Sequence, residues 1–426
     1  MEGITMKLRA LSIISVAILI TVSFTAGCFD RKEETKDDTT GEDTLYFAMN
    51  EVVNSSNIFS YDMYKHLLNG TDNVFFSPYS ITIALGMAYE GARGETASQM
   101  LDVIDLPEND KERRDMVRSL QTSLNPGNTP YDLSTANSYW LRTGGDLNDT
   151  YQNTIENDYK AHGQELDFAN DAEGSADTIN QWVEGETNEK IKNLITPDLI
   201  DFLTYLILVN AIYFKSDWKY QFDTEATEQE EFHLSDGGTT TVDMMNICDE
   251  EIDLNYSEDD HAQMLKLPYK GDALSMYVIL PRDNDISSLE ERLTKEYVDD
   301  LRSEMSGEWV DVRLPKFKFE QKYELNQELM DMGMPLAFSL NADFSGIKES
   351  GARDLYISDV IHKSFIEVNE EGTEAAAATA VVMREYGGGG QEMPIDFRAD
   401  HPFIFLIEHR ETGQILFMGK VEDPTV

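Results

Sequence analysis

The chain has 426 residues, enough for two or three average domains or for one large fold. Hydrophobic residues make up 41% and aromatic residues 10%, which excludes general disorder. The 80 acidic and 34 basic side chains give a formal net charge of −46, and this surplus repels phosphate, which excludes nucleic acid as a partner.

Acidic residues recur along the whole chain, with dense stretches at 225–231 and 249–260. Repulsion between these charges destabilises a compact state at low ionic strength, whereas salt near 1 M shortens the screening length to about 3 Å. We interpret the composition as adaptation to high salt. A soluble acidic surface without that role is the alternative.

The N-terminus has the pattern of an export signal. Lys7 and Arg9 precede the apolar run 11–22, and small residues follow at 25–27. The run is too short to cross about 30 Å of hydrocarbon comfortably as a mature helix. We therefore assign residues 1–27 to a signal peptide and expect an exported, extracellular or cell-surface protein.

The signal ends in Thr25-Ala26-Gly27-Cys28, which resembles a lipobox, although Thr25 stands where an aliphatic residue is usual. We expect Cys28 to carry a lipid that anchors the chain to the membrane. A plain secretory signal or an uncleaved anchor is the alternative. Two cysteines in all are too few for a disulfide framework or an all-cysteine zinc site, and a lipidated Cys28 would leave Cys248 as the only other thiol.

The next segment, residues 28–44, is charged, rich in threonine and nearly devoid of large apolar side chains. This composition indicates a solvated tether. The remainder, residues 45–426, contains neither a long low-complexity linker nor a fixed-period repeat. We expect it to form one globular domain and a monomer. Sequons at Asn54, Asn69, Asn148 and Asn255 are candidates for glycosylation on an exported chain.

Helices are expected first along this domain. Apolar spacing and start signals predict helical segments at 54–68, 80–90 (entered through Ser77-Pro78), from 94 onward, and 177–190. Strands dominate afterwards. The segment 204–214 is almost continuously apolar, as in a strand covered on both faces, and shorter β-like runs lie at 263–267, 274–280, 310–314, 365–369, 402–408 and 415–421. Helices before strands indicate an α+β class.

Chemistry-bearing motifs are missing from the sequence. It has no nucleophile elbow, no zinc-protease helix motif, no phosphate-binding loop and no dinucleotide fingerprint. The seven histidines are scattered without metal-ligand spacing. We therefore expect neither an enzyme nor a metal or other cofactor; a hydrolase with a triad of distant residues is the alternative.

One segment, residues 369–390, is unlike ordinary loop or strand. A glycine is followed by small residues, a β-branched patch and four glycines, and no proline occurs from Glu370 to Gln391. An Ala-rich helix before a flexible linker would explain it. Alternatively, the segment could enter a sheet later, because its small side chains can pass between strands and every residue keeps a backbone donor. The residues facing one side would then be Thr373, Ala375, Ala377, Thr379, Val381 and Met383.

Residues 370–379 (EEGTEAAAAT) resemble the hinge of the serpin family, and residues 370–396 its reactive-centre loop. Further stretches in the same order are similar to the family's early helices, central strand and C-terminal signature: 73–100, 208–234, 312–319, 355–369 and 397–406 (FRADHPFIFL). The resemblance spans most of 45–426 and implies a serpin-like α+β fold, with helices around a large central sheet, smaller sheets and an exposed loop.

Serpins are suicide inhibitors of serine proteases, so the resemblance implies a protease as partner. After the protease attacks the loop and becomes acylated, the cut loop inserts into the main sheet. Inserting residues 372–386 at about 3.3 Å per residue would carry the protease about 50 Å. The resemblance makes Glu370, Gly372, Thr373, Ala375, Ala377 and Thr379 the hinge, and the small residues among them imply an inhibitor. A non-inhibitory surface binding protein is the alternative.

The family's usual count from Glu370 places the scissile bond at Tyr386–Gly387, which suits chymotrypsin-like proteases. The long, glycine-rich stretch that follows leaves the register open. Arg384–Glu385 is the runner-up and would favour trypsin-like enzymes, and Met383–Arg384 is a third choice.

Two further sets of residues match mechanical parts of the family. Trp218 corresponds to the tryptophan of the "breach", where the sheet opens first. The "shutter", a hydrogen-bond cluster beneath the strands that must part, is matched by Ser77, Ser80, Asn210 and His362. Hydroxyls, an amide and an imidazole can exchange partners while staying satisfied.

Overall fold

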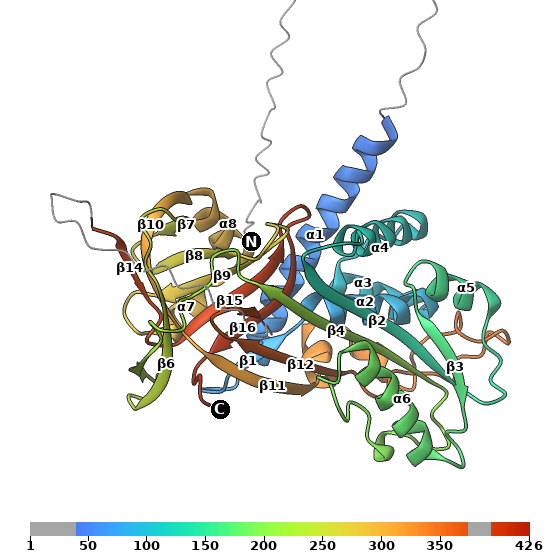
Figure 1. Cartoon of the computed structure of the whole chain (residues 1–426). Helices are drawn as coiled ribbons and strands as arrows, with labels where there is room; N and C mark the ends of the chain where they lie inside the picture. The colour runs from blue at the N-terminus through green and yellow to red at the C-terminus, as the bar shows by residue number, and fades with distance from the viewer. Residues whose placement is uncertain (1–39, 374–392) are drawn as a thin grey trace, which may run out of the picture. The chain divides into compact units, whose positions relative to one another are not determined.

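The computed structural model describes the backbone of residues 40–373 and 393–426, and the side chains from residue 53 within those ranges. The chain divides into residues 1–41 and a compact unit, residues 42–426, which is described here (Figure 1). In the described residues we find no helix whose length and hydropathy suit a bilayer crossing.

The helices are short apart from the first. They are α1 (Thr40–Leu67), α2 (Pro78–Gly91), α3 (Gly94–Ile104), α4 (Asp110–Leu124), α5 (Asp149–Asn157), α6 (Ala172–Glu186), α7 (Ile286–Arg292), α8 (Lys295–Ser303) and α9 (Asn326–Met332), with 3-10 turns η1 (Pro197–Leu199) and η2 (Pro335–Phe338).

Strands fill most of the remainder of this unit. They are β1 (Val74–Phe76), β2 (Tyr131–Arg142), β3 (His162–Leu166), β4 (Leu206–Asp217), β5 (Glu228–His233), β6 (Thr239–Ile247), β7 (Asp253–Glu258), β8 (Ala262–Pro268), β9 (Leu274–Pro281), β10 (Ser306–Pro315), β11 (Phe317–Glu324), β12 (Ile361–Val368), β13 (Gly372–Thr373), β14 (Ile395–Arg398), β15 (Phe403–His409) and β16 (Gln414–Val421).

The described strands form two sheets. The ten-stranded sheet has the order β1-β16-β15-β9-β8-β7-β10-β6-β5, with β14 beside β10. The six-stranded sheet has the order β11-β12-β13-β4-β2-β3. These sheets, with helices around them, confirm the α+β class expected from the order of elements.

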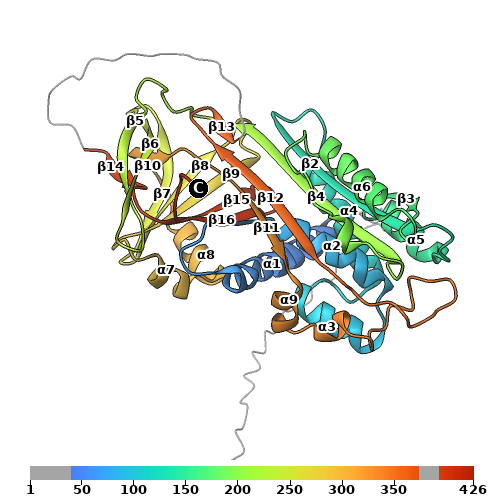
Figure 2. The same cartoon turned by 90° about the horizontal axis from the view of Figure 1, so that it is seen from below.

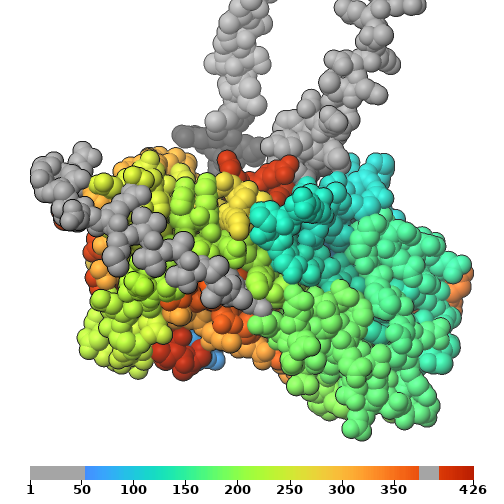
Figure 3. All heavy atoms as spheres, viewed as in Figure 1, coloured from blue at the N-terminus to red at the C-terminus, as the bar shows by residue number. Residues whose placement is uncertain are grey.

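Strand β4 is covered on both faces, as its continuous apolar pattern predicted. Val209 and Ala211 face a small core under α6, and Ile212 and Phe214 belong to the main core shared with α2. Helix α6 therefore lies over one face of β2 and β4, and α2 lies under the other (Figure 2). In the space-filling view, the green residues, which include α6, gather at the lower right of the visible face (Figure 3).

Local signals set the start of α2. Ser77 is its N-cap, accepting the N–H of Ser80 on Oγ at 3.1 Å, and Pro78 occupies the first turn. A short oxygen acceptor satisfies an orphan N–H, and proline loses nothing at this position. The entry expected through Ser77-Pro78 is therefore confirmed.

Other boundaries differ from expectation. The helix expected at 177–190 is α6, which starts at Ala172 because Asp171 caps it by accepting the N–H of Gly174 at 3.0 Å. It ends at Glu186, since Asn188 and Glu189 have positive φ. Helix α1 begins at Thr40, so the backbone of residues 40–44, expected in the tether, is helical. Extending a helix costs less than nucleating one.

Two strands are longer than expected. The run 310–314 lies in β10, which begins at Ser306, and the run 365–369 lies in β12 except for its last residue, since β12 spans Ile361–Val368. The polar start of β12 pairs in continuous register with β11, from Ile361 opposite Glu324 to Val368 opposite Phe317. A partner strand thus extends β structure into residues without a β-like pattern.

Candidate functional site

A two-residue strand, β13, lies between β12 and β4 at one end of the six-stranded sheet (Figure 2). Thr373 pairs with Val368 on one side and with Ser216 on the other, and Gly372 pairs with Asp217. Among the described residues, no backbone ladder joins β12 directly to β4. The facing edges of these two parallel strands therefore have a ladder partner only at β13.

Gly372 enters the sheet where no side chain fits. A Cβ atom at this position would lie 2.0 Å from the carbonyl oxygen of Ser216 and 2.7 Å from the Cα of Asp217. Both contacts are with backbone, which cannot move aside without breaking the ladder. The glycine of the expected hinge is thus required by close approach of two strands.

Trp218 holds the turn that leads into β13. Its indole Nε1 donates to the carbonyl of Asn369 at 2.9 Å, and its backbone N–H donates to the carbonyl of Glu371 at 2.7 Å. The side chain of Asn369 closes the turn by accepting the N–H groups of Glu371 and Gly372 at 3.0 and 3.3 Å. The residue predicted for the breach is therefore bonded to the start of the expected hinge.

Tyr269 supports the same corner and was missed by sequence reasoning. Its ring stacks on Trp218 with centroids 4.5 Å apart, and Phe214 meets it edge-on at 5.0 Å. Its hydroxyl lies 2.6 Å from the hydroxyl of Thr373. Burial raises the pKa of Tyr269, so the phenol stays protonated. The sequence shows Tyr269 only as a tyrosine after a strand.

Glu370 is fixed by three groups from separate parts of the chain. Its carboxylate accepts from Lys316 Nζ at 3.0 Å and from the Thr227 hydroxyl at 2.9 Å, and its carbonyl accepts the Phe222 N–H at 2.9 Å. Burial opposes ionisation, but these hydrogen bonds and the Lys316 charge outweigh it and hold the pKa of Glu370 below its usual value. The first hinge residue is thus an ionised anchor.

The four shutter residues form one connected chain of hydrogen bonds. The backbone N–H of Ser77 donates to His362 Nε2 at 3.0 Å, and Ser77 Oγ donates to the carbonyl of Leu416 at 2.6 Å. Ser80, held by its cap bond to Ser77, donates its hydroxyl to Asn210 Oδ1. These hydrogen bonds therefore connect β12, α2, β16 and β4, including the two strands that share no ladder, β12 and β4.

His362 is neutral in this network. Burial lowers its pKa from 6.5 to about 3. Because Nε2 accepts a hydrogen bond, the ring proton resides on Nδ1 at neutral pH. A protonated ring could no longer accept from Ser77.

The network continues to residues that the sequence did not single out. Asn210 Nδ2 donates to Asn137 Oδ1, and Asn137 Nδ2 donates to the carbonyl of Tyr159 at 2.6 Å. The Tyr159 hydroxyl donates to Glu90 at 3.1 Å, and Glu90 also binds Arg113 at 2.9 Å. These links join residues far apart in sequence, so no local pattern reveals them.

Several predicted residues lie outside the described ranges. These are the hinge residues Ala375, Ala377 and Thr379, the candidate scissile residues Met383, Arg384, Glu385, Tyr386 and Gly387, and the lipid-anchor candidate Cys28. Within the described ranges, Cys248 is an exposed free thiol, and no group of three or more His, Cys, Asp or Glu residues is placed to hold a metal. The sequon Asn148 caps α5 and donates to Glu349 at 2.9 Å, so its amide is already engaged.

Comparison with known proteins gives one consistent family. The family model described as "Serpin (serine protease inhibitor)" matches residues 54–424. An uncharacterised serpin-like protein of Thermococcus kodakarensis is 44% identical over 374 residues, covering 88% of this chain and 86% of that protein. The leukocyte elastase inhibitor of Bos taurus is 38% identical, covering 86% and 97%. The crystal structure of Serpin48 from the insect Tenebrio molitor matches with a TM-score of 0.76 and 33% identity, covering 88% and 98%.

Proposed function

The chain belongs to the serpin family of serine protease inhibitors, and we propose that it acts as a suicide substrate whose cut loop inserts between β12 and β4. The observation that carries this proposal is β13, which already pairs with β12 and with β4 at one end of these two strands. Cleavage beyond residue 373 would free the following residues to extend β13 along both unpaired edges.

The register of β13 sets how far the strand can extend. Gly372 pairs with Asp217 and Thr373 with Ser216, so an unbroken antiparallel continuation brings residue 386 opposite Leu203, just before β4 begins at Leu206. A loop cut after Tyr386 would therefore fill the whole length of β4. An attached acyl-enzyme would then be carried to the far end of the sheet.

The driving force is the new ladder. Each net backbone hydrogen bond contributes about 1 kcal/mol, so a strand of this length gains on the order of 10 kcal/mol before side-chain burial. This free energy is much larger than the contribution of any single contact, so insertion would be effectively irreversible. The intact chain would be metastable with respect to its cleaved form.

We propose Tyr386–Gly387 as the scissile bond and chymotrypsin-like proteases as targets, with Arg384–Glu385 and trypsin-like proteases as the second choice. Mixing the protein with chymotrypsin or trypsin, followed by a denaturing gel, tests this. A band at the summed mass supports inhibition, and mass spectrometry of the released C-terminal peptide locates the bond. Tyr386→Ala should abolish the chymotrypsin complex, while Arg384→Ala should leave it intact. Clipping without a complex would favour the non-inhibitory alternative.

We also propose that the protein is exported and anchored through a lipid on Cys28. The support is the sequence of residues 7–28 alone. Detergent phase partition of protein expressed in its natural host should place the wild type in the detergent phase and Cys28→Ser in the aqueous phase. Equal partition of the two would exclude the lipid.

A further inference from the structure

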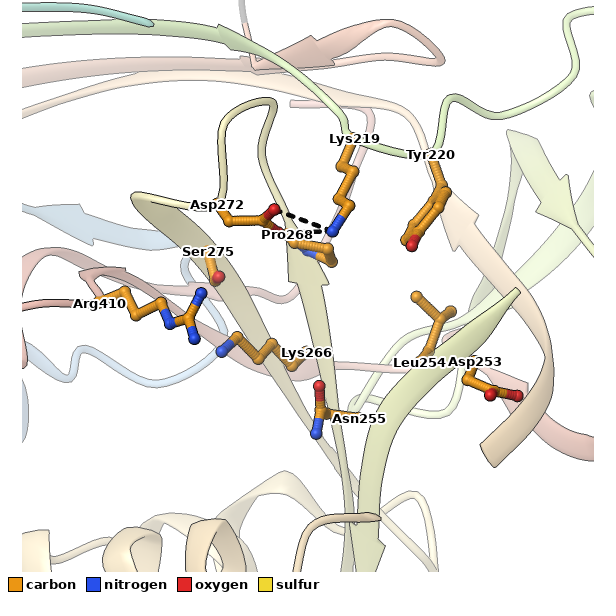
Figure 4. Close-up of a pocket in the computed structure, with 10 residues that line it drawn as sticks. All are labelled: Lys219, Tyr220, Asp253, Leu254, Asn255, Lys266, Pro268, Asp272, Ser275 and Arg410. Atoms are coloured by element: carbon orange, nitrogen blue, oxygen red, sulfur yellow. Dashed lines mark hydrogen bonds and ion pairs between the residues drawn. The ribbon is translucent and has the colours of Figure 1, made fainter. Parts of the chain in front are cut away.

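A cavity of about 250 Å³ opens on the ten-stranded sheet, apart from the edges of β12 and β4 with which the loop would pair (Figure 4). Its lining includes Lys219, Lys266 and Arg410, a concentration of positive charge in a chain whose net charge is −46. Two carboxylates, Asp253 and Asp272, also reach it.

Strand pairing places the groups together. Lys266 lies opposite Asn255 of β7 on one side, and Ser275 of β9 lies opposite Pro268, the next residue of β8 on the same face. Arg410, in the turn between β15 and β16, donates its backbone N–H to the carbonyl of Ala273 at 2.8 Å, which fixes the turn beside Ser275. Figure 4 shows Arg410, Lys266 and Ser275 directed toward a common space.

The positive charges differ in their partners. Lys219 is bound by Asp272, at 2.8 and 2.9 Å from the two carboxylate oxygens. Neither Lys266 nor Arg410 has a carboxylate of the described residues within ion-pair distance, and Lys266 Nζ lies over the ring of Tyr277, 5.5 Å from its centroid. Burial, and then the charge of Arg410, lowers the pKa of Lys266. Two unpaired cations thus face each other in a protein with more than two acidic side chains for each basic one.

Ser275 gives an independent indication of a ligand. Its side chain is 2% exposed, it lines the cavity, and its Oγ has no hydrogen-bond partner among the described residues. Buried hydroxyls in native proteins are normally satisfied. The acid opposite Ser275 on β15, Glu408, is bound by Arg302 at 2.6 Å, so its charge is already compensated.

The donor set has a defined chemistry. An ammonium, a guanidinium and a buried hydroxyl can all donate, and the first two cannot accept. Guanidinium and ammonium groups match the oxygens of phosphate, and charge-assisted hydrogen bonds to them are strong. We propose that this cavity is a binding site for a phosphate group, held by Lys266, Arg410 and Ser275. The site does not depend on the inhibitory mechanism proposed above.

Isothermal titration of the intact protein with inorganic phosphate, at fixed pH and with chloride keeping ionic strength constant, tests the site. One phosphate should bind per chain. Lys266→Met and Arg410→Met should each weaken binding by about tenfold or more, and Ser275→Ala by about threefold to tenfold. Parallel titrations with sulfate and with methyl phosphate show whether a free or an esterified group is preferred.

Lys270→Met is the matched control, because Lys270 lies in the β8–β9 turn, is paired with Asp217 at 3.4 Å and does not line the cavity. It removes the same charge and should leave the affinity unchanged. Melting each variant without phosphate verifies that it is folded. Absence of saturable binding, or an equal loss in Lys270→Met and Lys266→Met, would overturn the proposal.

Discussion

The hydroxyls of Thr373, in β13 of the six-stranded sheet, and Tyr269, just after β8 of the ten-stranded sheet, lie 2.6 Å apart. Thr373 is 3% exposed, and its strand neighbours are Val368 and Ser216. The expected hinge is therefore not wholly outside the fold before cleavage, because its first residues are already a strand. Insertion would extend an existing ladder and would not need a new nucleus.

Thr373→Arg should convert the inhibitor into a substrate. An arginine cannot be buried between β12 and β4 without leaving an unpaired charge in the sheet, so β13 cannot serve as the start of insertion. With chymotrypsin, the gel should show cleaved protein and almost no covalent complex. Thr373→Val, which keeps the shape and loses only the hydroxyl, should still form the complex. A stable complex with Thr373→Arg would refute this account of the hinge.

Acidification should loosen the shutter through His362. Its pKa is about 3 in the folded state against 6.5 when unperturbed, so between these values the unfolded chain binds a proton that the folded chain does not. Stability from this group is full above pH 6.5 and falls by up to about 1.4 kcal/mol per pH unit as the pH drops toward 3. Glu370, whose pKa is lowered, adds a loss in the same direction below about pH 4.5.

Urea unfolding at several pH values measures this dependence. His362→Asn should flatten the slope between pH 6 and 4, whereas His66→Gln, at an exposed histidine, should leave it unchanged. If the wild type and His362→Asn lose stability in parallel, His362 is not the group responsible.

Asn210→Ala should destabilise the intact protein by about 1–3 kcal/mol, because it leaves the Ser80 hydroxyl and the Asn137 amide oxygen without their partner. Asn153→Ala removes an exposed amide that donates to the carbonyl of Asp149, and it should change stability by less than about 0.5 kcal/mol. The denaturant midpoints of the two variants, each compared with the wild type, measure these losses of stability. Similar losses would mean that the shutter network contributes nothing specific.

Salt should stabilise the fold, because the net charge of −46 is spread over the chain. The thermal midpoint should rise steadily from about 0.05 M to 1 M potassium chloride as the screening length falls from above 10 Å to about 3 Å. Refolding yield should rise with it. Equal thermal midpoints at the lowest and the highest salt concentration would contradict the interpretation as salt adaptation.

The sequence predicted correctly those elements whose structure is determined by a local pattern of residues. The unbroken apolar run of β4 and the Ser77-Pro78 start of α2 are examples, and Gly372 and Trp218 were found through the family resemblance. The sequence did not predict elements and roles that depend on contacts with residues far away in the chain. The polar edge strand β5, with Phe232 as its one buried residue, carries no β-like pattern, and Tyr269, Asn137 and Tyr159 acquire their roles only through contacts across the fold.

The central claim is that the intact chain stores free energy that one cut releases. Thermal unfolding of the intact protein and of the same protein nicked within its loop measures this directly. The nicked form should melt far above the intact one, because a strand added between β12 and β4 stabilises it. Identical melting temperatures would contradict it.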